Sequence, residues 1–379
     1  MKRVLIIRNY LLDDQPSMRL YVDSLERELR AKGWSIVSLK PWVVFARLSF
    51  GLDFLEKWLG YLDKFILLTI RLWIVARSYE LVHIADHSYS WLSYFSLKNN
   101  HLVTCHDLLA IRSALGEFKN IHKTRWSGRI LQKMIIQGLK HARAIVCVSE
   151  NTRQDLYRLI PVSKNRTWVI YNGVNRDFRK YSLEEARKVI ETKLPLELVN
   201  GKKSFFFHVG IDSWYKNRRS LIAAFIELSE NHDCHLVLAR GPMSAEEKRL
   251  IQKGNIFDRI HFIGRVSDEE IQALYSLAQA FVFPSWIEGF GWPIIEAQIC
   301  GCPVIISDRE PLKTIAGKSA IWIDPLFVDS IADGMKKSLF ESSEEREERV
   351  QRGFENCLYY SQERMIGQYH QLYHRMMPR

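Results

Sequence analysis

The chain lacks the marks of several large classes of protein. Its six cysteines, at positions 105, 147, 234, 300, 302 and 357 of 379, have neither the spacing of a disulfide framework nor that of a paired zinc site. No period of about 20 to 50 residues recurs, which argues against solenoid and propeller folds. The net charge of +11 comes without a zinc-finger, helix-turn-helix or RNA-recognition signature, so no nucleic-acid partner is expected. Anionic lipid or phosphate ligands explain that charge at least as well.

A hydrophobic run long enough to cross a bilayer is also missing. The very apolar segment 65–76 has twelve residues and contains Arg71, whereas a membrane-spanning helix needs about 20. Two interpretations of the segment remain open. It is either a buried helix of the first domain or, with tryptophans at positions 42, 58 and 73 nearby, part of a surface that lies in a membrane interface.

Basic residues are unevenly placed along the chain. From Arg112 to Arg143 there are eight Lys or Arg and one acid, Glu117. Such a stretch is either a solvated face or a surface attracted to anionic lipid, and peripheral attachment to the inner face of a membrane is a hypothesis. The amino terminus, 1–8, is too short for a secretory signal and has the pattern of a β-strand. Together with the unpaired cysteines, it predicts a cytoplasmic setting.

The length of the chain predicts two domains, because one hydrophobic core rarely serves 379 residues. Short apolar runs alternate with helix-length segments, as in α/β folds. We therefore predict two doubly wound Rossmann-like domains, with a linker between Asn172 and Lys202, where segment 184–200 is helical without a clear core stripe. The expected strands are 3–8, 35–39, 81–85, 102–105, 144–148 and 168–171, then 204–210, 235–239, 261–263, 280–283, 304–307 and 321–323.

The most informative segment is 280–296, Ala-Phe-Val-Phe-Pro-Ser-Trp-Ile-Glu-Gly-Phe-Gly-Trp-Pro-Ile-Ile-Glu. A strand, a Gly-Phe-Gly loop and a helix that begins at Pro293 predict a ligand site at the carboxyl end of the strand. The glycines let backbone N–H groups approach a ligand, and the helix N-terminus favours a phosphate. Glu288 would accept from a sugar hydroxyl, and Glu296, expected in the first helical turn, from a ribose diol. The plainer alternative is a carboxylate that complements the helix dipole beside a common glycine turn.

Two further strand ends carry candidate residues. After the strand that ends at Gly210, Lys216 precedes a helix, where a cation opposes the helix dipole unless an anion binds there. The alternative is a solvated surface lysine. His106 and Asp107 follow the strand 102–105, and the aspartate is placed to orient the imidazole ring. The alternative for this pair is a capping or core-satisfied role.

The string through Ser285, Glu288-Gly-Phe-Gly-Trp-Pro, Glu296-Ala and Gly301-Cys-Pro-Val closely resembles the Glu-x7-Glu signature of family 4 retaining glycosyltransferases, which have the GT-B fold. The resemblance implies that Glu288 contacts the donor sugar and that Glu296 holds the ribose. It also implies that loop N–H groups hold the sugar and diphosphate; the loop comprises Gly289, Phe290, Gly291 and Trp292.

Three other elements are similar to the same family. Gly210-x5-Lys216-Asn217 resembles the element whose lysine holds the donor pyrophosphate. Relatives carry a histidine at the strand end occupied by His106, and that histidine contacts the donor sugar. Relatives also hold the nucleobase through backbone groups at the position of Gly264-Arg265-Val266.

The resemblance implies the GT-B plan of an acceptor-side domain, 1–180, and a nucleotide-sugar-binding domain, 181–356, which face each other across a cleft. A closing helix within 357–379 would cross back onto the first domain. The implied activity is retaining, hexosyl-type transfer from a nucleotide-diphosphate sugar to a lipid-linked, polysaccharide or other hydroxyl acceptor, with Lys216, Glu288 and His106 as catalytic residues. No cofactor is expected. No Asp-x-Asp triplet occurs, so no metal is expected, and Lys216 and helix N-termini would stabilise the departing diphosphate.

The sequence departs from the family pattern in two places. Ile211 stands where many relatives carry an arginine, so Arg218, Arg219 or Arg19 would have to supply a second phosphate cation. The first loop, 9–18, contains no glycine, whereas many relatives have a glycine-rich loop there. An inactive nucleotide-sugar-binding or scaffolding protein of the same fold is therefore an alternative, as is a GT-B epimerase or phosphorylase.

Overall fold

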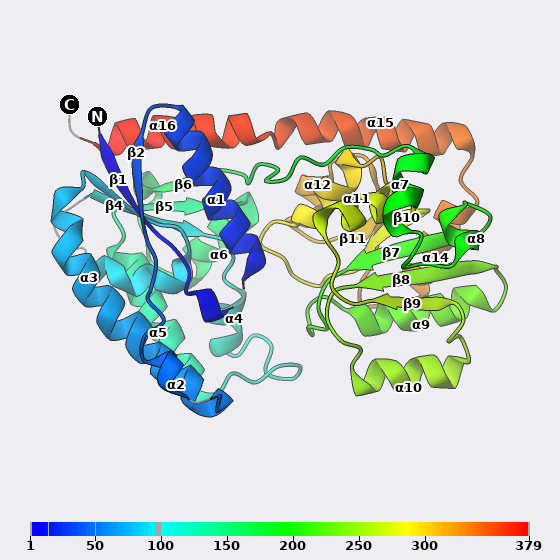
Figure 1. Ribbon diagram of the computed structural model, residues 1–379, viewed down its shortest axis with the longest axis horizontal. Helices are drawn as coiled ribbons and strands as arrows, with labels where there is room; N and C mark the ends of the chain where they lie inside the picture. Colours follow the sequence, from blue (N-terminus) through cyan, green and yellow to red (C-terminus); the bar gives the residue numbers. More distant parts are fainter. Residues whose placement is uncertain (1, 14, 50, 95–99, 378–379) are drawn as a thin grey trace. The chain divides into compact units, whose positions relative to one another are not determined.

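The computed structural model describes residues 2–13, 15–49, 51–94 and 100–377. The chain divides into two compact units (Figure 1): unit 1 comprises residues 1–175 and 362–379, and unit 2 comprises residues 176–361. Each unit contains a six-stranded sheet whose paired strands run parallel. The predicted fold class, two doubly wound α/β domains, is confirmed.

The sheet of unit 1 has the order β2-β1-β3-β4-β5-β6. Its strands are β1 (Arg3–Ile7), β2 (Ser35–Leu39), β3 (Leu81–Ile84), β4 (Asn100–Cys105), β5 (Ala144–Cys147) and β6 (Thr167–Val169). The helices of this unit include α1 (Pro16–Ala31), α4 (Leu109–Ala114), α5 (Trp126–His141), α6 (Glu150–Leu159) and α16 (Gln362–Met376). Strands β3 and β5 are buried along their whole length, as expected for central strands covered on both faces.

A buried hydrogen-bond network holds α16 to the sheet of unit 1. His83 on β3 bonds to the Tyr373 hydroxyl at 2.6 Å and to Thr104 Oγ1 at 2.8 Å. Thr104 Oγ1 also lies 3.0 Å from the Tyr369 hydroxyl, which pairs with the Tyr21 hydroxyl on α1 at 2.6 Å. Burial lowers the pKa of His83 to about 3, so its ring is neutral. Because these buried groups satisfy one another, the network fixes the position of the last helix.

The sheet of unit 2 has the order β12-β11-β10-β7-β8-β9. Its strands are β7 (Ser204–Val209), β8 (Cys234–Ala239), β9 (Ile260–Ile263), β10 (Ala280–Phe283), β11 (Val304–Ser307) and β12 (Ala320–Ile323). Its longer helices are α9 (Arg218–Ser229), α10 (Ala245–Gly254), α11 (Asp268–Leu277), α12 (Trp292–Ile299), α14 (Val328–Leu339) and α15 (Ser343–Tyr359). Three consecutive phenylalanines of β7, at 205–207, are buried in the centre of the sheet.

Part of the segment that was expected as a linker is folded into unit 2. Helix α7 (Leu183–Ile190) begins at a capping box formed by Ser182 and Glu185, and it packs on α11. Ala186 and Ile190 are buried. The expectation that this segment has no core stripe was therefore wrong. The helix has only eight residues and few of them face the core, so the helical periodicity of its apolar residues could not be recognised in the sequence.

The apolar segment 65–76 belongs to a continuous helical stretch with two different faces. Leu68 and Leu72 are buried in the core of unit 1, whereas Ile66, Ile70 and Trp73 are about half exposed. One face is therefore core, and the other presents apolar side chains to solvent. In the described part of the chain, none of the helices combines the length and the apolar character required to span a bilayer. The stretch consists of α2 (Asp53–Leu62), the π-helical turn η3 (Asp63–Leu67) and α3 (Leu68–Val75).

Candidate functional site

Lys216 and Glu288, two of the residues predicted for unit 2, lie where the strand order of its sheet reverses. Strand β7 pairs with β8 on one side and with β10 on the other, so the chain builds the sheet outward from β7 in both directions. Ligands of open α/β sheets bind at such a switch point, beyond the carboxyl ends of the strands. The loops that follow β7 and β10 carry Lys216 and Glu288, and they meet at this point.

Lys216 and Glu288 contact each other directly. Nζ of Lys216 lies 2.7 Å from Oε1 of Glu288, and the two side chains are 16% and 12% exposed. The ammonium group also lies 4.8 Å from the ring centre of Phe283 and 5.5 Å from that of Tyr215. The structure thus brings an ammonium group and a carboxylate together beside two aromatic rings. An ammonium group is suited to an anionic ligand, and a carboxylate is suited to hydroxyl groups.

Gly291 starts helix α12 in a conformation that favours glycine. Its φ is 107°, and an added Cβ would lie 3.0 Å from Cδ2 of Leu312. The N-terminus of α12, with its partial positive charge, follows directly on the glycine loop. The helix begins at Trp292, with Pro293 in second position, so Glu296 is the fifth helical residue. The expectation that Glu296 lies in the first turn was wrong, because proline fits the second position as well as the first.

Glu296 is a buried carboxylate with a partner that the sequence did not reveal. It is 7% exposed, and its Oε1 lies 3.3 Å from Nη1 of Arg176. Nε of Arg176 lies 3.3 Å from Oδ2 of Asp268. Burial raises the pKa of Glu296, although Arg176 and Arg240 act in the opposite direction. A buried carboxylate of this kind gains from further hydrogen-bond donors, such as the hydroxyls of a diol.

Arg218 does not supply the second phosphate cation that the sequence suggested. It is 1% exposed, and its Nε and Nη2 each donate to the Glu247 carboxylate at 2.7 Å. Its Nη1 donates to the carbonyl oxygens of Gly210 at 2.9 Å and Arg240 at 3.2 Å. The expectation was wrong because the first turn of α9 is packed against α10. Arg218 instead holds the Gly210 loop from behind.

Arg219 and Arg19 were the other two candidates for a second phosphate cation. Arg219 is exposed and pairs with Glu246 and, at 3.9 Å, with Asp212. Arg19 lies on α1 and so belongs to unit 1. Ile211, which replaces the expected arginine, is half exposed, and its Cα would lie 3.2 Å from a Cβ added to Gly241. The second cation for the diphosphate is thus not assigned to any of the three.

The remaining predicted contacts of unit 2 lie at two places. Arg265 and Val266 follow β9 at the outer edge of the sheet, and the Arg265 carbonyl accepts from Lys193 at 3.4 Å. The Phe290 ring is buried between Trp292 and Tyr360, with ring centres at 5.8 and 5.7 Å. The Phe290 side chain therefore packs within unit 2 and supports the glycine loop.

His106 lies in unit 1, directly after β4, and is buried. Its Nε2–H donates to the Ala85 carbonyl at 2.9 Å, which fixes the tautomer and leaves the lone pair on Nδ1. Burial lowers the pKa of His106, so the ring is neutral. Asp86 is the carboxylate that acts on it most strongly. Oδ1 of Asp107 accepts from the Leu109 N–H at 2.9 Å and caps the start of α4.

A polar cluster after β3 was not expected from the sequence. Asp86 and His87 are buried, with Oδ1 and Nδ1 3.4 Å apart. Asp86 also accepts from Asn9 Nδ2 at 2.5 Å and from the Ser88 N–H at 2.8 Å. Strand β1 lies between β2 and β3, so this cluster occupies the switch point of unit 1. The rule applied to His106, polar residues directly after a buried strand, would have found it.

Two Rossmann-like units, one with strand-end loops that meet at its switch point, are the plan of the GT-B structural class. Residues 18–178 match the family model described as Glycosyltransferase Family 4, and residues 190–355 match the model described as Glycosyl transferases group 1. The two matches together span most of both units. The chain belongs to glycosyltransferase family 4, group 1.

Solved structures agree with this fold. Sucrose-phosphate synthase from Thermosynechococcus elongatus superposes with a TM-score of 0.73, at 20% identity, over 99% of both chains. HepE from Anabaena, in complex with UDP and glucose, superposes with a TM-score of 0.76, at 14% identity, over 98% of this chain and 99% of its own.

Curated relatives with sequence similarity include two enzymes of O-antigen synthesis. O-antigen chain mannosyltransferase B of Escherichia coli is 29% identical over 219 residues, which are 57% of this chain and 56% of that protein. O-antigen chain mannosyltransferase RfbU of Salmonella typhimurium is 29% identical over 230 residues, 60% of this chain and 58% of that protein. The matches therefore span a little over half the length of these relatives.

Proposed function

We propose that the protein is a retaining glycosyltransferase that moves a sugar from a nucleotide-diphosphate sugar to a hydroxyl of a glycan or lipid-linked acceptor. The observation that carries the proposal is the 2.7 Å contact between Lys216 and Glu288, beside a glycine loop and a helix N-terminus at the switch point of unit 2. This arrangement has the groups that a sugar diphosphate requires: a cation and backbone donors for phosphate, and carboxylates for hydroxyls.

In the proposed reaction, the diphosphate competes with Glu288 for Lys216. The Lys216 ammonium and the N-terminus of α12 stabilise the negative charge that develops on the leaving group, which lowers the barrier without a bound metal. Glu288 accepts from a hydroxyl of the donor sugar, Glu296 accepts from the ribose, and the neutral His106 contacts the donor sugar. The acceptor hydroxyl attacks the anomeric carbon from the face that the diphosphate leaves, its proton passes to the departing phosphate oxygen as the bond from the anomeric carbon to that oxygen breaks, and the anomeric configuration is retained.

The test is a nucleotide-release screen over UDP-, GDP- and ADP-sugars. Mannosyl donors come first because the relatives are named as mannosyltransferases, and UDP-glucose follows because HepE binds it. We expect Lys216→Ala to lower kcat about 100-fold and Glu296→Gln to raise the KM of the donor about tenfold. Lys188→Ala, at an exposed lysine of α7, is the matched control and should be unchanged.

Each part of the proposal has its own contradicting result. No release with any donor would favour the inactive binding or scaffolding protein. Normal turnover in both site variants would show that the site is elsewhere. The anomeric proton coupling of the product, measured by NMR, decides between retention and inversion. Loss of activity in EDTA, with recovery on addition of Mg²⁺ or Mn²⁺, would contradict the metal-independent mechanism.

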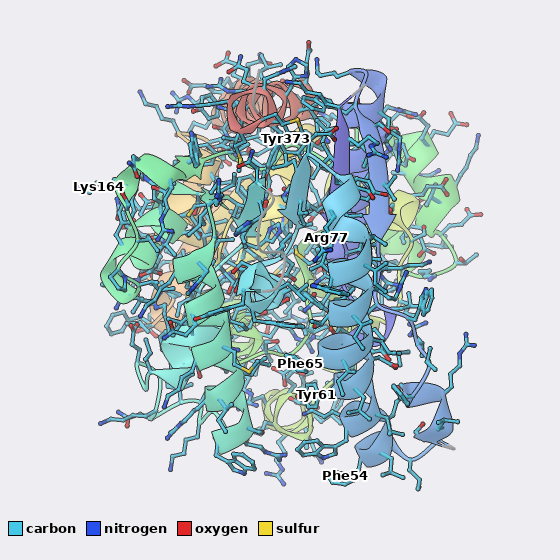
Figure 2. All side chains as sticks on the ribbon, turned by 90° about the vertical axis from the view of Figure 1, so that its left-hand side faces the viewer. Phe54, Tyr61, Phe65, Arg77, Lys164 and Tyr373 are labelled. Carbon is cyan, nitrogen blue, oxygen red and sulfur yellow. The ribbon has the colours of Figure 1, made fainter. Side chains whose placement is uncertain are left out.

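We also propose that unit 1 attaches to an anionic membrane surface through the exposed face of α2 and α3. Large apolar side chains recur on this face at about one per helical turn, and cations lie among aromatic rings: Arg71 is 3.6 Å from the Trp42 ring centre and Arg77 is 4.9 Å from that of Trp73. Figure 2 shows this helical stretch from Phe54 at its lower end to Arg77. Apolar and aromatic groups bordered by cations suit a lipid interface. The exposed side chains include Leu55, Trp58, Leu62, Ile66, Ile70, Trp73 and Ile74.

Sedimentation with vesicles tests this attachment. The full chain should sediment with vesicles that contain phosphatidylglycerol, less so with pure phosphatidylcholine, and progressively less as salt rises. Ile66→Ser combined with Ile70→Ser should abolish sedimentation, whereas Leu358→Ser, at an exposed leucine of α15, should not. An equal distribution with both lipids across the salt series would contradict the proposal.

A further inference from the structure

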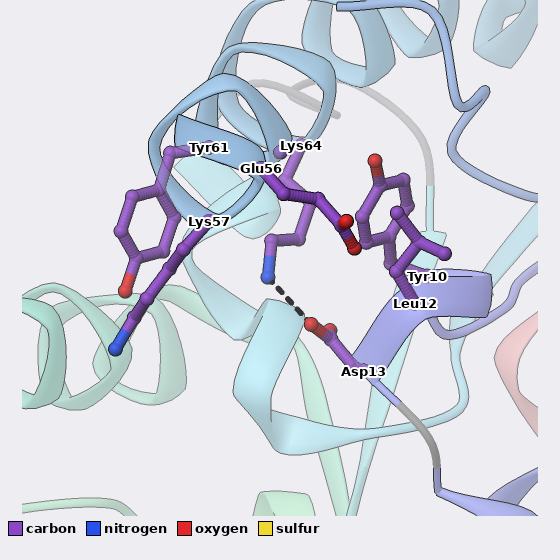
Figure 3. A pocket seen from close by; sticks show the side chains of 8 residues that line it. Tyr10, Leu12, Asp13, Glu56, Lys57, Tyr61 and Lys64 are labelled. Carbon is purple, nitrogen blue, oxygen red and sulfur yellow. Dashed lines mark hydrogen bonds and ion pairs between the residues drawn. The ribbon is translucent and has the colours of Figure 1, made fainter. Parts of the chain in front are cut away.

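Unit 1 contains a pocket that none of the proposed donor contacts uses. Its volume is about 410 Å³, which lies within the range of roughly 300 to 1,000 Å³ for small-molecule sites. It opens between helix α2 and the loop after β1 (Figure 3). The lining residues are Tyr10, Leu12 and Asp13 from the loop and Glu56, Lys57, Gly60, Tyr61 and Lys64 from the helical stretch.

The wall of the pocket is held by a buried carboxylate. Asp63, on the helical stretch, accepts from the Tyr10 hydroxyl at 2.8 Å and from the backbone N–H groups of Phe45 at 2.9 Å and Ala46 at 3.1 Å. Gly60 lets the helix approach this tyrosine, because an added Cβ would lie 3.3 Å from the Tyr10 ring. The Tyr10 side of the pocket is therefore held in place by bonds within the protein, which reduces the entropy lost on binding.

The charges that line the pocket cancel. Lys57 and Lys64 bring two positive charges, Asp13 and Glu56 bring two negative charges, and Lys64 pairs with Asp13 at 2.8 Å. A phosphate would meet two carboxylates, and an organic cation would meet two ammonium groups. A neutral ligand rich in hydroxyl groups finds acceptors on the carboxylates and donors on the lysines. The balance of charge favours an uncharged polyol.

Aromatic rings narrow the ligand class further. In Figure 3 the Tyr61 ring stands beside Lys57 on one side of the pocket, and Tyr10 and Leu12 stand on the other. The C–H faces of a pyranose are apolar, and aromatic rings cover such faces while the ring edges keep their hydrogen bonds. We infer that this pocket binds an uncharged pyranose ring. If the protein has the proposed function, this pyranose is part of the acceptor; that assignment rests on the proposed function.

Binding of simple glycosides to the full chain tests the inference. The probes are methyl α-mannoside, methyl α-glucoside and methyl α-galactoside, followed by saturation-transfer NMR, with inorganic phosphate as the anionic comparison. Tyr61→Ala should weaken binding of at least one glycoside about tenfold, and Tyr61→Phe should keep it within about twofold, because the ring face carries the contact. Binding that is lost in Glu288→Gln and kept in Tyr61→Ala would place the glycoside at the donor site and overturn the inference. So would the absence of binding by all three.

A second variant tests the argument from charge and does not depend on Tyr61. Glu56→Gln keeps the shape of the side chain but gives the pocket a net positive charge. We expect phosphate, which should not bind the wild-type pocket, to bind the variant, with competition by salt. Tight phosphate binding by the wild-type chain that Lys64→Met removes would overturn the assignment of an uncharged ligand.

Kinetics separate this inference from the proposed function. Once a donor is known, hydrolysis of that donor without acceptor should be the same in wild type and Tyr61→Ala, while the KM for the acceptor should rise about tenfold. If the wild type releases no nucleotide, the proposed function fails, and the glycoside titrations still decide the pocket. If donor hydrolysis itself falls in Tyr61→Ala, the residue acts elsewhere and the pocket assignment is wrong.

Discussion

At the scale of single residues, Arg218 illustrates a charge that is buried to position a loop. Its guanidinium spans the Glu247 carboxylate and the carbonyl oxygens of Gly210 and Arg240. Removing one partner of a buried ion pair leaves the other unsolvated, whereas replacing both by apolar groups is often neutral. Replacing both Arg218 and Glu247 should therefore change the position of the Gly210 loop more than it changes the free energy of unfolding.

We expect Arg218→Met to lower the free energy of unfolding by about 3–5 kcal/mol, because Glu247 stays buried without its partner. Arg218→Met combined with Glu247→Leu should recover most of that loss, yet the KM for the donor should stay raised because the Gly210 loop has lost its anchor. Urea denaturation and donor kinetics measure the two effects. Arg219→Met, at the exposed neighbour, is the control and should change stability by less than about 0.5 kcal/mol. A double variant as unstable as the single one would mean that the carbonyl contacts of Arg218, or the capping box that Glu247 forms with Ser244 at the start of α10, outweigh the ion pair.

Glu296 predicts a dependence of stability on pH. Burial raises its pKa above the ordinary value of 4.5, so the folded chain binds the proton more tightly than the unfolded chain. The stability that Glu296 contributes is therefore complete below pH 4.5 and is lost as pH rises through the raised pKa. We expect the difference in unfolding free energy between wild type and Glu296→Gln to fall from pH 4 to pH 7. A difference that increases over this range would show that the ion pair with Arg176 outweighs burial.

At the scale of elements, the attachment of α16 depends on polar contacts inside the core of unit 1. The hydroxyl of Tyr373 is bonded to His83, which is fully buried. We expect Tyr373→Phe to lower the free energy of unfolding by about 1–3 kcal/mol, because a buried ring nitrogen loses its partner. Tyr94→Phe, at a more exposed tyrosine of the same unit, should leave it almost unchanged. Equal unfolding curves for the two variants would mean that apolar packing alone holds the helix.

The elements also show what the sequence could and could not predict. Strands and strand-end residues followed from local patterns, so Lys216 and Glu288 were each expected at a strand end of the second domain; that their strands are neighbours and that the two side chains touch is shown by the structure. Arg176 could not be predicted as the partner of Glu296, because 120 positions separate them and no motif marks the arginine. The sequence could not decide which face of α2 and α3 is buried. Apolar residues occupy both faces, so their periodicity does not indicate which side packs on the core.

At the scale of the whole chain, the two units differ in the number of chain segments that form them. Unit 2 is one continuous segment, 176–361, whereas unit 1 needs the return of residues 362–379. The residues proposed to bind the donor diphosphate and ribose all lie in the continuous unit, including Lys216, Glu288 and Glu296. A continuous segment with its own sheet and core is able to fold without the rest of the chain.

We therefore expect residues 176–361, expressed alone, to fold cooperatively and to bind the nucleotide diphosphate within about tenfold of the affinity of the full chain. Transfer to an acceptor should be absent, because His106 and the pocket of unit 1 are missing. Circular dichroism and calorimetric titration with UDP and GDP measure folding and binding, and Lys216→Ala in the same fragment is the control that should bind weakly. The residues 1–175 alone should be less stable than unit 1 in the full chain, since the His83 network is incomplete without α16. A folded fragment 176–361 that does not bind the nucleotide bound by the full chain would show that unit 1 supplies part of the donor site.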